Sequence, residues 1–427
     1  MSQSSEDSQP SQYKVRAVHC HYQSSDDDVY EALKRATDPL ADSWERLRKA
    51  KRIGIKFNQD KEPKNRVYFE GMLQQLVSKK LARAFLRLLR ERTDAHIVVP
   101  DVSFYSMYHE GVTLDQTMTF ADVFEEFDVE YVNGIEPPYK RVAVPATDKM
   151  DGGQMFAQYL LPEGAVEVDE FVSVAKMKNH AFMGITLTLK NLFGLMPGEP
   201  EGHTRTYFHH LVRMPYMLAD LGRIFNPCLN IVDGLIGQAG REWGNGRDEG
   251  PTQIPNTIVA GNHTIATDAC TAHLMGHDPQ VDWLTPPFHR DRNSLLVAAE
   301  AGFGTVNLDE IDFASEVQAP VGEFYSALTD SVETNISWKR TTAEQALYYV
   351  DHRKKLIDQY AGEYILLQQG EVRWHDPVSD LRASRRAIAG DRPDQALWLK
   401  YVDPDEQEDE RFHVYDHALM QAKEAAV

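Results

Sequence analysis

Cysteine is scarce in this sequence, and several other signatures of familiar protein classes are missing. Its three cysteines, Cys20, Cys228 and Cys270, lie far apart and include no CxxC pair. The sequence therefore encodes neither a zinc knuckle nor an iron–sulfur cluster, and we expect no disulfide framework. It also has no run of about eighteen apolar residues, so it predicts no membrane-spanning helix.

Basic residues are outnumbered by acidic ones. The 427 residues include 65 Asp and Glu against 45 Lys and Arg, which gives a formal net charge of −20. This balance argues against a nucleic-acid partner, because phosphate backbones are bound by basic surfaces. Residues 1–12 are polar and acidic and lack the basic and apolar regions of a signal peptide. We therefore expect a disordered leader and a cytoplasmic protein.

Residues 13–313 alternate short apolar runs with longer helical patterns and form the predicted main domain. The apolar runs are rich in β-branched residues and apolar on both faces, which is typical of buried parallel strands. The predicted strands are residues 15–19, 52–57, 96–100, 129–132, 170–175, 229–233 and 257–260. The predicted helices are residues 70–92, 120–127, 184–193, 211–225, 264–275 and 293–301. This order predicts an α/β fold with a mostly parallel sheet flanked by helices.

The pattern changes after residue 313. Residues 314–360 read as a helical connection, with a helix predicted over 338–360. Residues 361–427 predict a small ββαβ module, a C-terminal α+β appendage. Its predicted elements are strands 363–368 and 371–375 around a turn at Gln369-Gly370, a helix over 377–389 with Asp376 as N-cap, and a strand over 396–402. The acidic run 403–410 is expected to be solvated.

The stretch 172–194 is the part of the sequence that points to chemistry. It begins as an apolar strand, continues with Lys176, Lys178 and His180, and ends in a predicted helix that contains Lys190 and Asn191. Cations and a histidine placed between a strand and a helix N-terminus suit an anion-binding site.

Polar residues also follow other predicted strands. Ligands of open parallel sheets bind outside the carboxyl ends of the strands, so residues at those ends are candidates for a site. Lys56 and Asn58 lie at the end of strand 52–57, Asp101 follows strand 96–100, and Asp233 ends strand 229–233. We expect the carboxylates to face the lysines of the 172–194 stretch across one crevice.

Each candidate also has a simpler interpretation. Lys176 and Lys178 could be ordinary exposed lysines, and Lys190 could lie along the surface instead of being a buried cation that awaits an anion. Asp101 and Asp233 could start turns. The glycine-rich segment 234–250 matches neither a Walker A nor a GxGxxG motif. It fits a mobile active-site lid and a loop without function equally well.

A cluster of histidines is the second signal. Arg205, His209 and His210 fall in the segment EGHTRTYFHH, directly before a predicted helix. Together with Asp101 and Asp233, the two adjacent histidines would make an open site for a divalent metal. The spacing matches no HExxH-type motif, and a structural or acid–base role is the alternative.

These segments together carry a family resemblance. The blocks FVSVAKMKNHAFMGITLTLKNLFGLMPG, LNIVDGLIG and IVAGNHTIATDACTAHLMG resemble the family catalogued as domain of unknown function 362, over roughly residues 53–313. The resemblance implies no assigned activity. Many members carry ferredoxin-type cysteine clusters, but this sequence lacks those cysteines, so an iron–sulfur role is not carried over. The tail around residues 359–381 resembles another uncharacterised module, domain of unknown function 5678.

The residues and the resemblance together favour an enzyme of unassigned reaction that acts on a small anionic substrate, a carboxylate or a phosphate. The expected catalytic residues are His180 as general acid or base, Lys190 and Asp233. The expected substrate-binding residues are Lys56, Asn58, Lys176, Lys178, Asn191 and Arg205. The expected ligands of a divalent metal, if one assists, are Asp101, His209, His210 and Asp233. The alternative is a non-catalytic anion-binding or accessory protein, and the sequence does not fix its oligomeric state.

Overall fold

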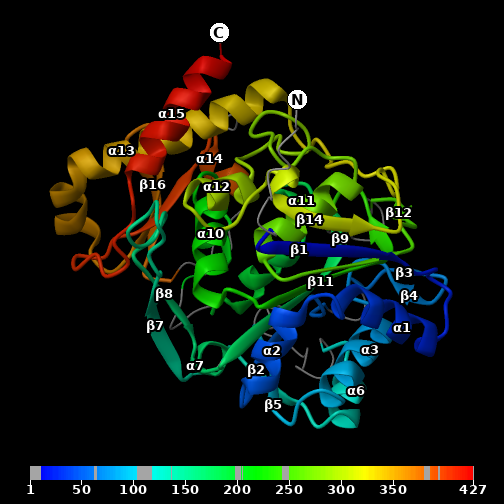
Figure 1. Ribbon diagram of the computed structural model, residues 1–427. Helices are drawn as coiled ribbons and strands as arrows, with labels where there is room; N and C mark the ends of the chain where they lie inside the picture. Colours follow the sequence, from blue (N-terminus) through cyan, green and yellow to red (C-terminus); the bar gives the residue numbers. More distant parts are fainter. Residues whose placement is uncertain are drawn as a thin grey trace, which may run out of the picture.

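The computed structural model describes residues 11–61, 65–102, 118–135, 137–197, 203, 205–242, 250–378, 385–392 and 395–426. A ten-stranded sheet runs through the centre of the molecule, with its main strands in the order β14-β1-β13-β11-β9-β2-β5-β6 (Figure 1). These strands are β1 Tyr13–His19, β2 Arg52–Phe57, β5 His96–Asp101, β6 Glu130–Asn133, β9 Glu170–His180, β11 Leu229–Gln238, β13 Thr257–Gly261 and β14 Ile311–Ser315. Two short strands extend the sheet: β10, Gly184–Thr186, pairs with β9, and β12, Thr252–Gln253, pairs with β11.

The five neighbouring strands β11, β9, β2, β5 and β6 are mutually parallel. Their carboxyl ends therefore meet at one edge of the sheet, where ligands of open α/β folds bind. β13 runs antiparallel to both of its neighbours, so its carboxyl end lies at the opposite edge. The α/β prediction with a mostly parallel sheet is confirmed.

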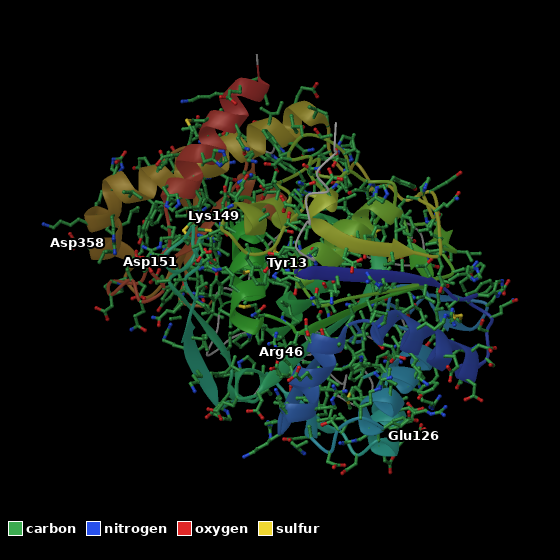
Figure 2. The ribbon with its side chains drawn as sticks, in the orientation of Figure 1. Tyr13, Arg46, Glu126, Lys149, Asp151 and Asp358 are labelled. Atoms are coloured by element: carbon green, nitrogen blue, oxygen red, sulfur yellow. The ribbon has the colours of Figure 1, made fainter. Side chains whose placement is uncertain are left out.

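Helices cover both faces of the sheet and enclose two hydrophobic cores. One face carries α1 Asp26–Thr37, α2 Ala41–Lys49, α3 Lys79–Arg90 and α6 Ala121–Glu126. The other face carries α8 Thr188–Asn191, α10 Arg213–Phe225, α11 Thr264–Leu274 and α12 Ser294–Glu300. Figure 2 shows side chains filling the space between the sheet and the helices on its two faces. Arg46 on α2 and Glu126 on α6, which lie on the first of these faces, are labelled.

Shorter elements connect these layers. They are the hairpin β3 Tyr68–Phe69 and β4 Met72–Leu73, the hairpin β7 Tyr139–Ala143 and β8 Gln158–Pro162, the helices α7 Glu163–Val166 and α9 Arg205–Phe208, and the 3-10 turns η2 Leu192–Leu195 and η3 Leu308–Glu310. None of the helices in the described part of the chain is both long and apolar enough to cross a bilayer.

The C-terminal part packs on the face that carries α10. It contains the long helix α13 Val332–Tyr360, a three-stranded antiparallel sheet in the order β16-β15-β17, and the helices α14 Arg385–Ala389 and α15 His413–Ala425. The strands are β15 Tyr364–Gln368, β16 Glu371–Asp376 and β17 Trp398–Tyr401. Side chains of this part, such as Trp398 and Tyr415, belong to the same core as the α10 side of the main sheet.

Several predicted elements need correction. The predicted helix 70–92 begins only at Lys79, because Gly71, with φ of 81°, turns the β3–β4 hairpin and Ser78 caps the helix. The predicted helix 184–193 is a strand, β10, followed by two short helical turns. β14 crosses the expected domain boundary at residue 313, and α15 was not predicted. Residues 379–384 of the predicted helix 377–389 lie outside the described residues.

Candidate functional site

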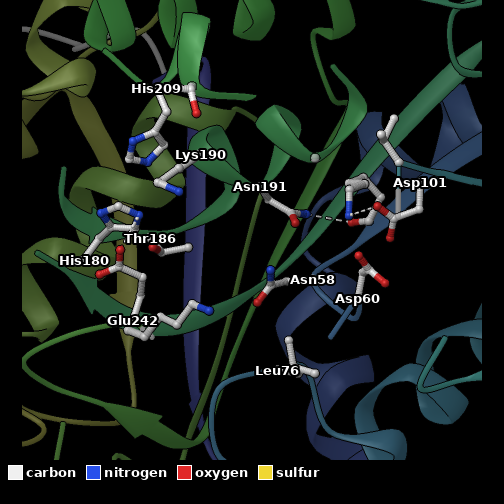
Figure 3. A pocket seen from close by; sticks show the side chains of 15 residues that line it. Asn58, Asp60, Leu76, Asp101, His180, Thr186, Lys190, Asn191, His209 and Glu242 are labelled. Atoms are coloured by element: carbon white, nitrogen blue, oxygen red, sulfur yellow. Dashed lines mark hydrogen bonds and ion pairs between the residues drawn. The ribbon is translucent and has the colours of Figure 1, made fainter. Parts of the chain in front are cut away.

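A cavity of about 400 Å³ lies at the carboxyl edge of the parallel strands (Figure 3). Its lining comes from β2, β5, β9, β10, the α8–η2 turn, α9 and the loops that follow the strands. The lining residues are Lys56, Asn58, Asp60, Leu76, Asp101, Val102, Lys178, His180, Thr186, Lys190, Asn191, Gly194, Thr206, His209 and Glu242. In the view of Figure 3, His180, Lys190, His209 and Glu242 gather on one side, Asp60 and Asp101 lie on the other, and Asn58 and Asn191 lie between them.

Lys56 and Asp101 form the wall at the β2–β5 side. The Lys56 Nζ lies 3.0 Å from Asp101 Oδ1, and both side chains are buried. The same Nζ donates to the Phe57 carbonyl at 2.6 Å, and Gln59 donates to Asp101 Oδ2 at 3.1 Å. The charge of Lys56 is therefore largely balanced within the protein.

His180 ends β9 and faces Glu242. The backbone N–H groups of Phe182 and Met183 both donate to His180 Nδ1 at 3.1 Å. Nδ1 is therefore the unprotonated nitrogen, and the neutral ring carries its hydrogen on Nε2. Nε2 lies 3.1 Å from Glu242 Oε1, while Ala181 N–H donates to Glu242 Oε2 at 2.7 Å. The backbone thus fixes both the tautomer of the histidine and the position of the carboxylate.

Lys178 lies two residues before His180, on the same face of β9, and its side chain is buried. Its Nζ donates to the Gln75 carbonyl at 2.8 Å. Burial lowers the pKa of Lys178 well below its ordinary value, and the positive charges of Lys61 and Lys190 lower it further. A buried lysine whose pKa is depressed by other lysines is typical of a functional site.

Three oxygen atoms at the cavity wall are shielded from solvent and accept no hydrogen bond from the described residues. They are Asn58 Oδ1, Thr186 Oγ1 and Asn191 Oδ1. Asn191 is held by its Nδ2, which donates to the Lys56 carbonyl at 2.8 Å and to Ser173 Oγ at 3.1 Å. Buried polar atoms are nearly always satisfied in folded proteins, so these oxygens suit a ligand with a hydroxyl or amine donor.

Asp268 supports the turn that carries Lys190 and Asn191. From α11, its carboxylate accepts hydrogen bonds from the Thr188 N–H at 2.9 Å and the Leu189 N–H at 2.8 Å. These are unpaired donors of the first turn of α8, so Asp268 anchors the start of this short helix. Burial raises the pKa of Asp268 to about 7, although these donors lower it. Asp268 anchors the site without lining it.

Lys176 and Asp233, which were predicted to bind substrate and to act in catalysis, do not line the cavity. They are fully buried, with Lys176 Nζ 3.3 Å from Asp233 Oδ2, on adjacent positions of β9 and β11. The strands β9 and β11 run several residues beyond their predicted ends, so both side chains lie within the sheet and not in a loop.

The predicted metal ligands do not converge. Asp101 pairs with Lys56 and Asp233 with Lys176, while His209 lines the cavity. His210 Nε2 lies 3.1 Å from the Leu397 carbonyl oxygen and 3.3 Å from the Leu399 nitrogen, so its ring contacts the C-terminal part. Within the described ranges, no group of three or more His, Cys, Asp or Glu could hold a metal ion. The side chain of Arg205, the remaining predicted anion ligand, lies outside the described residues.

Glu242 and Asp60 line the cavity but were not predicted as site residues. Asp60 follows β2 two residues after Asn58, so the strand-end rule could have included it. Glu242 lies in the glycine-rich segment after β11, which was considered as an active-site lid. An acidic residue in such a segment could have indicated that Glu242 belongs to the site.

The fold and this cavity define an α/β protein with a lysine-rich pocket at the carboxyl edge of its sheet. The family model described as "Domain of unknown function (DUF362)" matches residues 55–273, which contain all the lining residues of that pocket. The chain belongs to this family. The match does not reach the C-terminal part, so the resemblance of that part to a second family stays a prediction.

Two further proteins are similar to this chain. The "Thylakoid-associated protein sll1697" of Synechocystis sp. is 25% identical over 157 residues, which cover 34% of this chain and 46% of that protein. The chain thus spans about half the length of this curated relative. The lactate racemase apoprotein from Thermoanaerobacterium thermosaccharolyticum aligns with a TM-score of 0.33 and 15% identity, over 62% of this chain and 57% of that one.

Proposed function

We propose that this protein is an enzyme that acts on a small anionic substrate, a carboxylate or a phosphate, in the cavity at the carboxyl edge of the sheet. The observation that carries the proposal is the meeting of Lys56, Lys178 and Lys190 with the His180–Glu242 pair in one cavity. Its volume of about 400 Å³ suits a small metabolite.

The lysines supply the attraction for the anion. Lys56 is already balanced by Asp101, and Lys178 and Lys190 line the same cavity and add positive charge to it. A bound anion would stabilise the charged form of Lys178, whose pKa burial depresses. The unfilled acceptor Asn191 Oδ1 would take a hydroxyl or amine of the same ligand.

The His180–Glu242 pair would perform proton transfer next to the bound anion. Glu242 carries an acceptor oxygen, and His180 presents an N–H at Nε2 because its Nδ1 already accepts two backbone hydrogen bonds. In this proposal Glu242 takes a proton from the substrate, and the Nε2 hydrogen of His180, which faces Glu242 Oε1, is shared with the substrate oxygen on which charge develops. This assignment refines the role of His180 as a general acid or base that its sequence position suggested.

A screen in deuterated buffer tests the proposal. The purified protein is incubated with small carboxylates and phosphate monoesters, and NMR records exchange of substrate C–H hydrogen for deuterium, a direct readout of proton transfer. We expect exchange with at least one compound, and a loss of about a hundredfold or more in Glu242→Gln. Lys178→Met should weaken binding of the same compound, while Lys49→Met, which removes an exposed lysine on α2, should change neither.

The same experiment separates an enzyme from a non-catalytic anion-binding protein. A binding protein needs the lysines but not the proton-transfer pair. A non-catalytic binding protein would bind a compound, would bind it less tightly in Lys178→Met, and would show no deuterium exchange or other turnover. This combination of results would replace our proposal with the alternative function. If neither Lys178→Met nor Glu242→Gln affects any bound compound, the cavity is not the site.

A further inference from the structure

A second cavity, of about 470 Å³, adjoins the first. His209 and Glu242 line both cavities, so these two side chains form a shared wall. The second cavity lies between the residues that directly follow β9 and the C-terminal part. Ala181 and Phe182 line it on the first side, and Trp338 of α13 and Arg385 of α14 line it on the second. Nothing in the proposed proton transfer uses this space.

Arg290 lies against two aromatic rings at this second cavity. Its guanidinium carbon lies 5.1 Å from the centre of the Phe182 ring and 5.0 Å from that of Trp338. Stacking of this kind fixes the plane of the guanidinium and leaves its edges for hydrogen bonds to an anion. The Nη1 atom lies 3.4 Å from Asp330, while Nε is shielded from solvent and has no hydrogen-bond partner in the described part of the chain.

Arg385 is the second cation of this cavity, and no acidic side chain among the described residues pairs with it. Its Nε and Nη2 atoms are shielded from solvent without hydrogen-bond partners there. Burial, together with the positive charges of Arg213 and Arg290, lowers the pKa of Arg385 to about 10. A buried guanidinium without a partner is costly to the folded state, and an anion would remove that cost.

The acidic side chains nearby do not cancel these two cations. Glu242 is engaged by the Ala181 N–H at 2.7 Å and by His180 at 3.1 Å on the side of the first cavity. Asp330 lies 3.4 Å from Arg290 Nη1 and also accepts the Thr329 hydroxyl at 2.8 Å, while Asp291 pairs with Lys339 at 3.6 Å. His210, which also lines the cavity, is neutral, because burial lowers its pKa well below its ordinary value.

We propose that the second cavity binds a second anionic group of the same substrate, through Arg290 and Arg385. The substrate is then an elongated molecule with an anion at each end, either two carboxylates or a carboxylate and a phosphate. One end lies among Lys56, Lys178 and Lys190, and the other end reaches the second cavity past His209 and Glu242, which line both cavities. This inference rests on the proposed function, since it extends the site of that function.

Linear dicarboxylates of about four to eight carbons, each compared with the monocarboxylate of the same length, test the proposal by calorimetry. ω-Phosphonocarboxylates of the same lengths form a second arm that tells a carboxylate from a phosphate at the far end. At one or more lengths, we expect the second anionic group to strengthen binding at least about tenfold, which is a usual gain for charge-assisted hydrogen bonds to arginine. Arg385→Gln should abolish this gain, and Arg290→Lys should reduce it, because lysine keeps the charge but lacks the planar guanidinium. Both variants should leave the affinity for the monocarboxylate unchanged.

Arg340→Gln is the matched control, because Arg340 lies on α13 close to Trp338 but is exposed and pairs with Glu344. It should keep the gain. Circular dichroism and the thermal midpoint establish that each variant is folded, and Arg290→Lys serves if Arg385→Gln does not fold. The proposal is wrong if no dianion binds more tightly than its monoanion, or if the gain survives in both folded arginine variants. In that case a Lys178→Met variant that loses the monocarboxylate would still identify the first cavity as the anion site, and deuterium exchange that depends on Glu242 would still uphold the proposed function.

Discussion

Lys176 and Asp233 form an ion pair inside the sheet, with 3.3 Å between Nζ and Oδ2 and with both side chains fully buried. They occupy paired positions on the parallel strands β9 and β11. Asp233 also accepts the Ser78 N–H at 2.6 Å and the Leu235 N–H at 3.0 Å, and Ser78 is the N-cap of α3. The pair therefore ties two strands to the start of a helix.

Removing one partner should destabilise the protein strongly. Asp233→Ala leaves the Lys176 cation buried without a counter-charge, and we expect a loss of about 3–5 kcal/mol in the free energy of unfolding. The double variant Lys176→Met/Asp233→Leu should recover much of this loss, because apolar pairs of similar size often replace buried ion pairs at little cost. Urea unfolding measures both effects. If the double variant is folded but no longer binds the substrate, Asp233 contributes to the site after all.

Lys178 should make anion binding depend on pH. Since burial depresses its pKa, Lys178 is charged at low pH and loses its proton at a pH where an ordinary lysine is still charged. We expect the affinity for sulfate, whose own charge is constant, to fall as the pH rises through values at which an ordinary lysine is still charged, with a slope approaching about one decade per pH unit. Calorimetry across this range gives the slope.

Lys178→Arg provides the control for this dependence, since a guanidinium stays charged across the whole range. The variant should bind sulfate with a flatter pH profile, and Lys49→Met should keep the profile of the unchanged protein. An identical slope in Lys178→Arg would assign the titration to another group.

The central strands of the sheet could be predicted well from the sequence because they are apolar on both faces. A local run of apolar residues is enough to predict such a strand, without knowledge of the strands that pair with it. The strand over 52–57 agrees with β2 at both ends. The C-terminal halves of β9 and β11 were not predicted, because the polar residues Lys176, Lys178 and Asp233 are typical of loops. Only the packing of the neighbouring strands shows that these side chains are buried. The antiparallel direction of β13 is known only from its pairing with neighbouring strands, and no residue within the strand predicts it.

The site was predictable to the extent that it follows strand ends. Lys56, Asn58, Asp101, Lys178 and His180 lie near the ends of β2, β5 and β9 and line the cavity. The second cavity could not be predicted in this way, because Arg290 and Arg385 are distant from each other in sequence and come together only when the C-terminal part packs against the main sheet. Periodicity within a segment carries no information on such packing.

Glu410 should make the docking of the C-terminal part sensitive to acid. It is fully buried and pairs with Arg213 of α10 at 2.8 Å and with Lys400 of β17 at 2.8 Å. Burial raises the pKa of Glu410, but Arg213 and Lys400 outweigh burial and lower it to about 2. A lowered pKa means that this stabilisation is complete above pH 4.5, the ordinary pKa, and is lost as the pH falls towards 2.

Glu410→Gln tests this prediction. The variant should lose about 3–5 kcal/mol at neutral pH, because Arg213 and Lys400 keep their buried charges without a partner. The difference in unfolding free energy from the unchanged protein should shrink by about 2 kcal/mol between about pH 6 and pH 3. Glu424→Gln, an exposed change on α15, should show no such dependence. A difference that stays constant with pH would show that Glu410 is not ionised in the folded protein.

Gly194 lies against the cation of the first cavity wall. A Cβ atom at this position would come within 2.6 Å of Lys56 Cε and 3.0 Å of its Nζ, and within 3.6 Å of Asp101 Oδ1. Gly194→Ala must therefore displace the end of the Lys56 side chain, which is flexible, and this disturbs its 3.0 Å ion pair with Asp101.

We expect Gly194→Ala to cost only about 1 kcal/mol of stability, because the atoms that must move are the far end of a lysine and not backbone. Its effect on the cavity should be larger, because Asp101 then faces the ligand without its counter-charge, and sulfate affinity should fall about tenfold. A double-mutant cycle with Lys56→Met isolates the cause. If the methyl group acts through Lys56, Gly194→Ala has no further effect on sulfate binding once Lys56 is Met, so the two changes are strongly non-additive. Additive losses would mean that the methyl group narrows the cavity itself, and the role of Gly194 would then be to leave room for the ligand and not for the lysine.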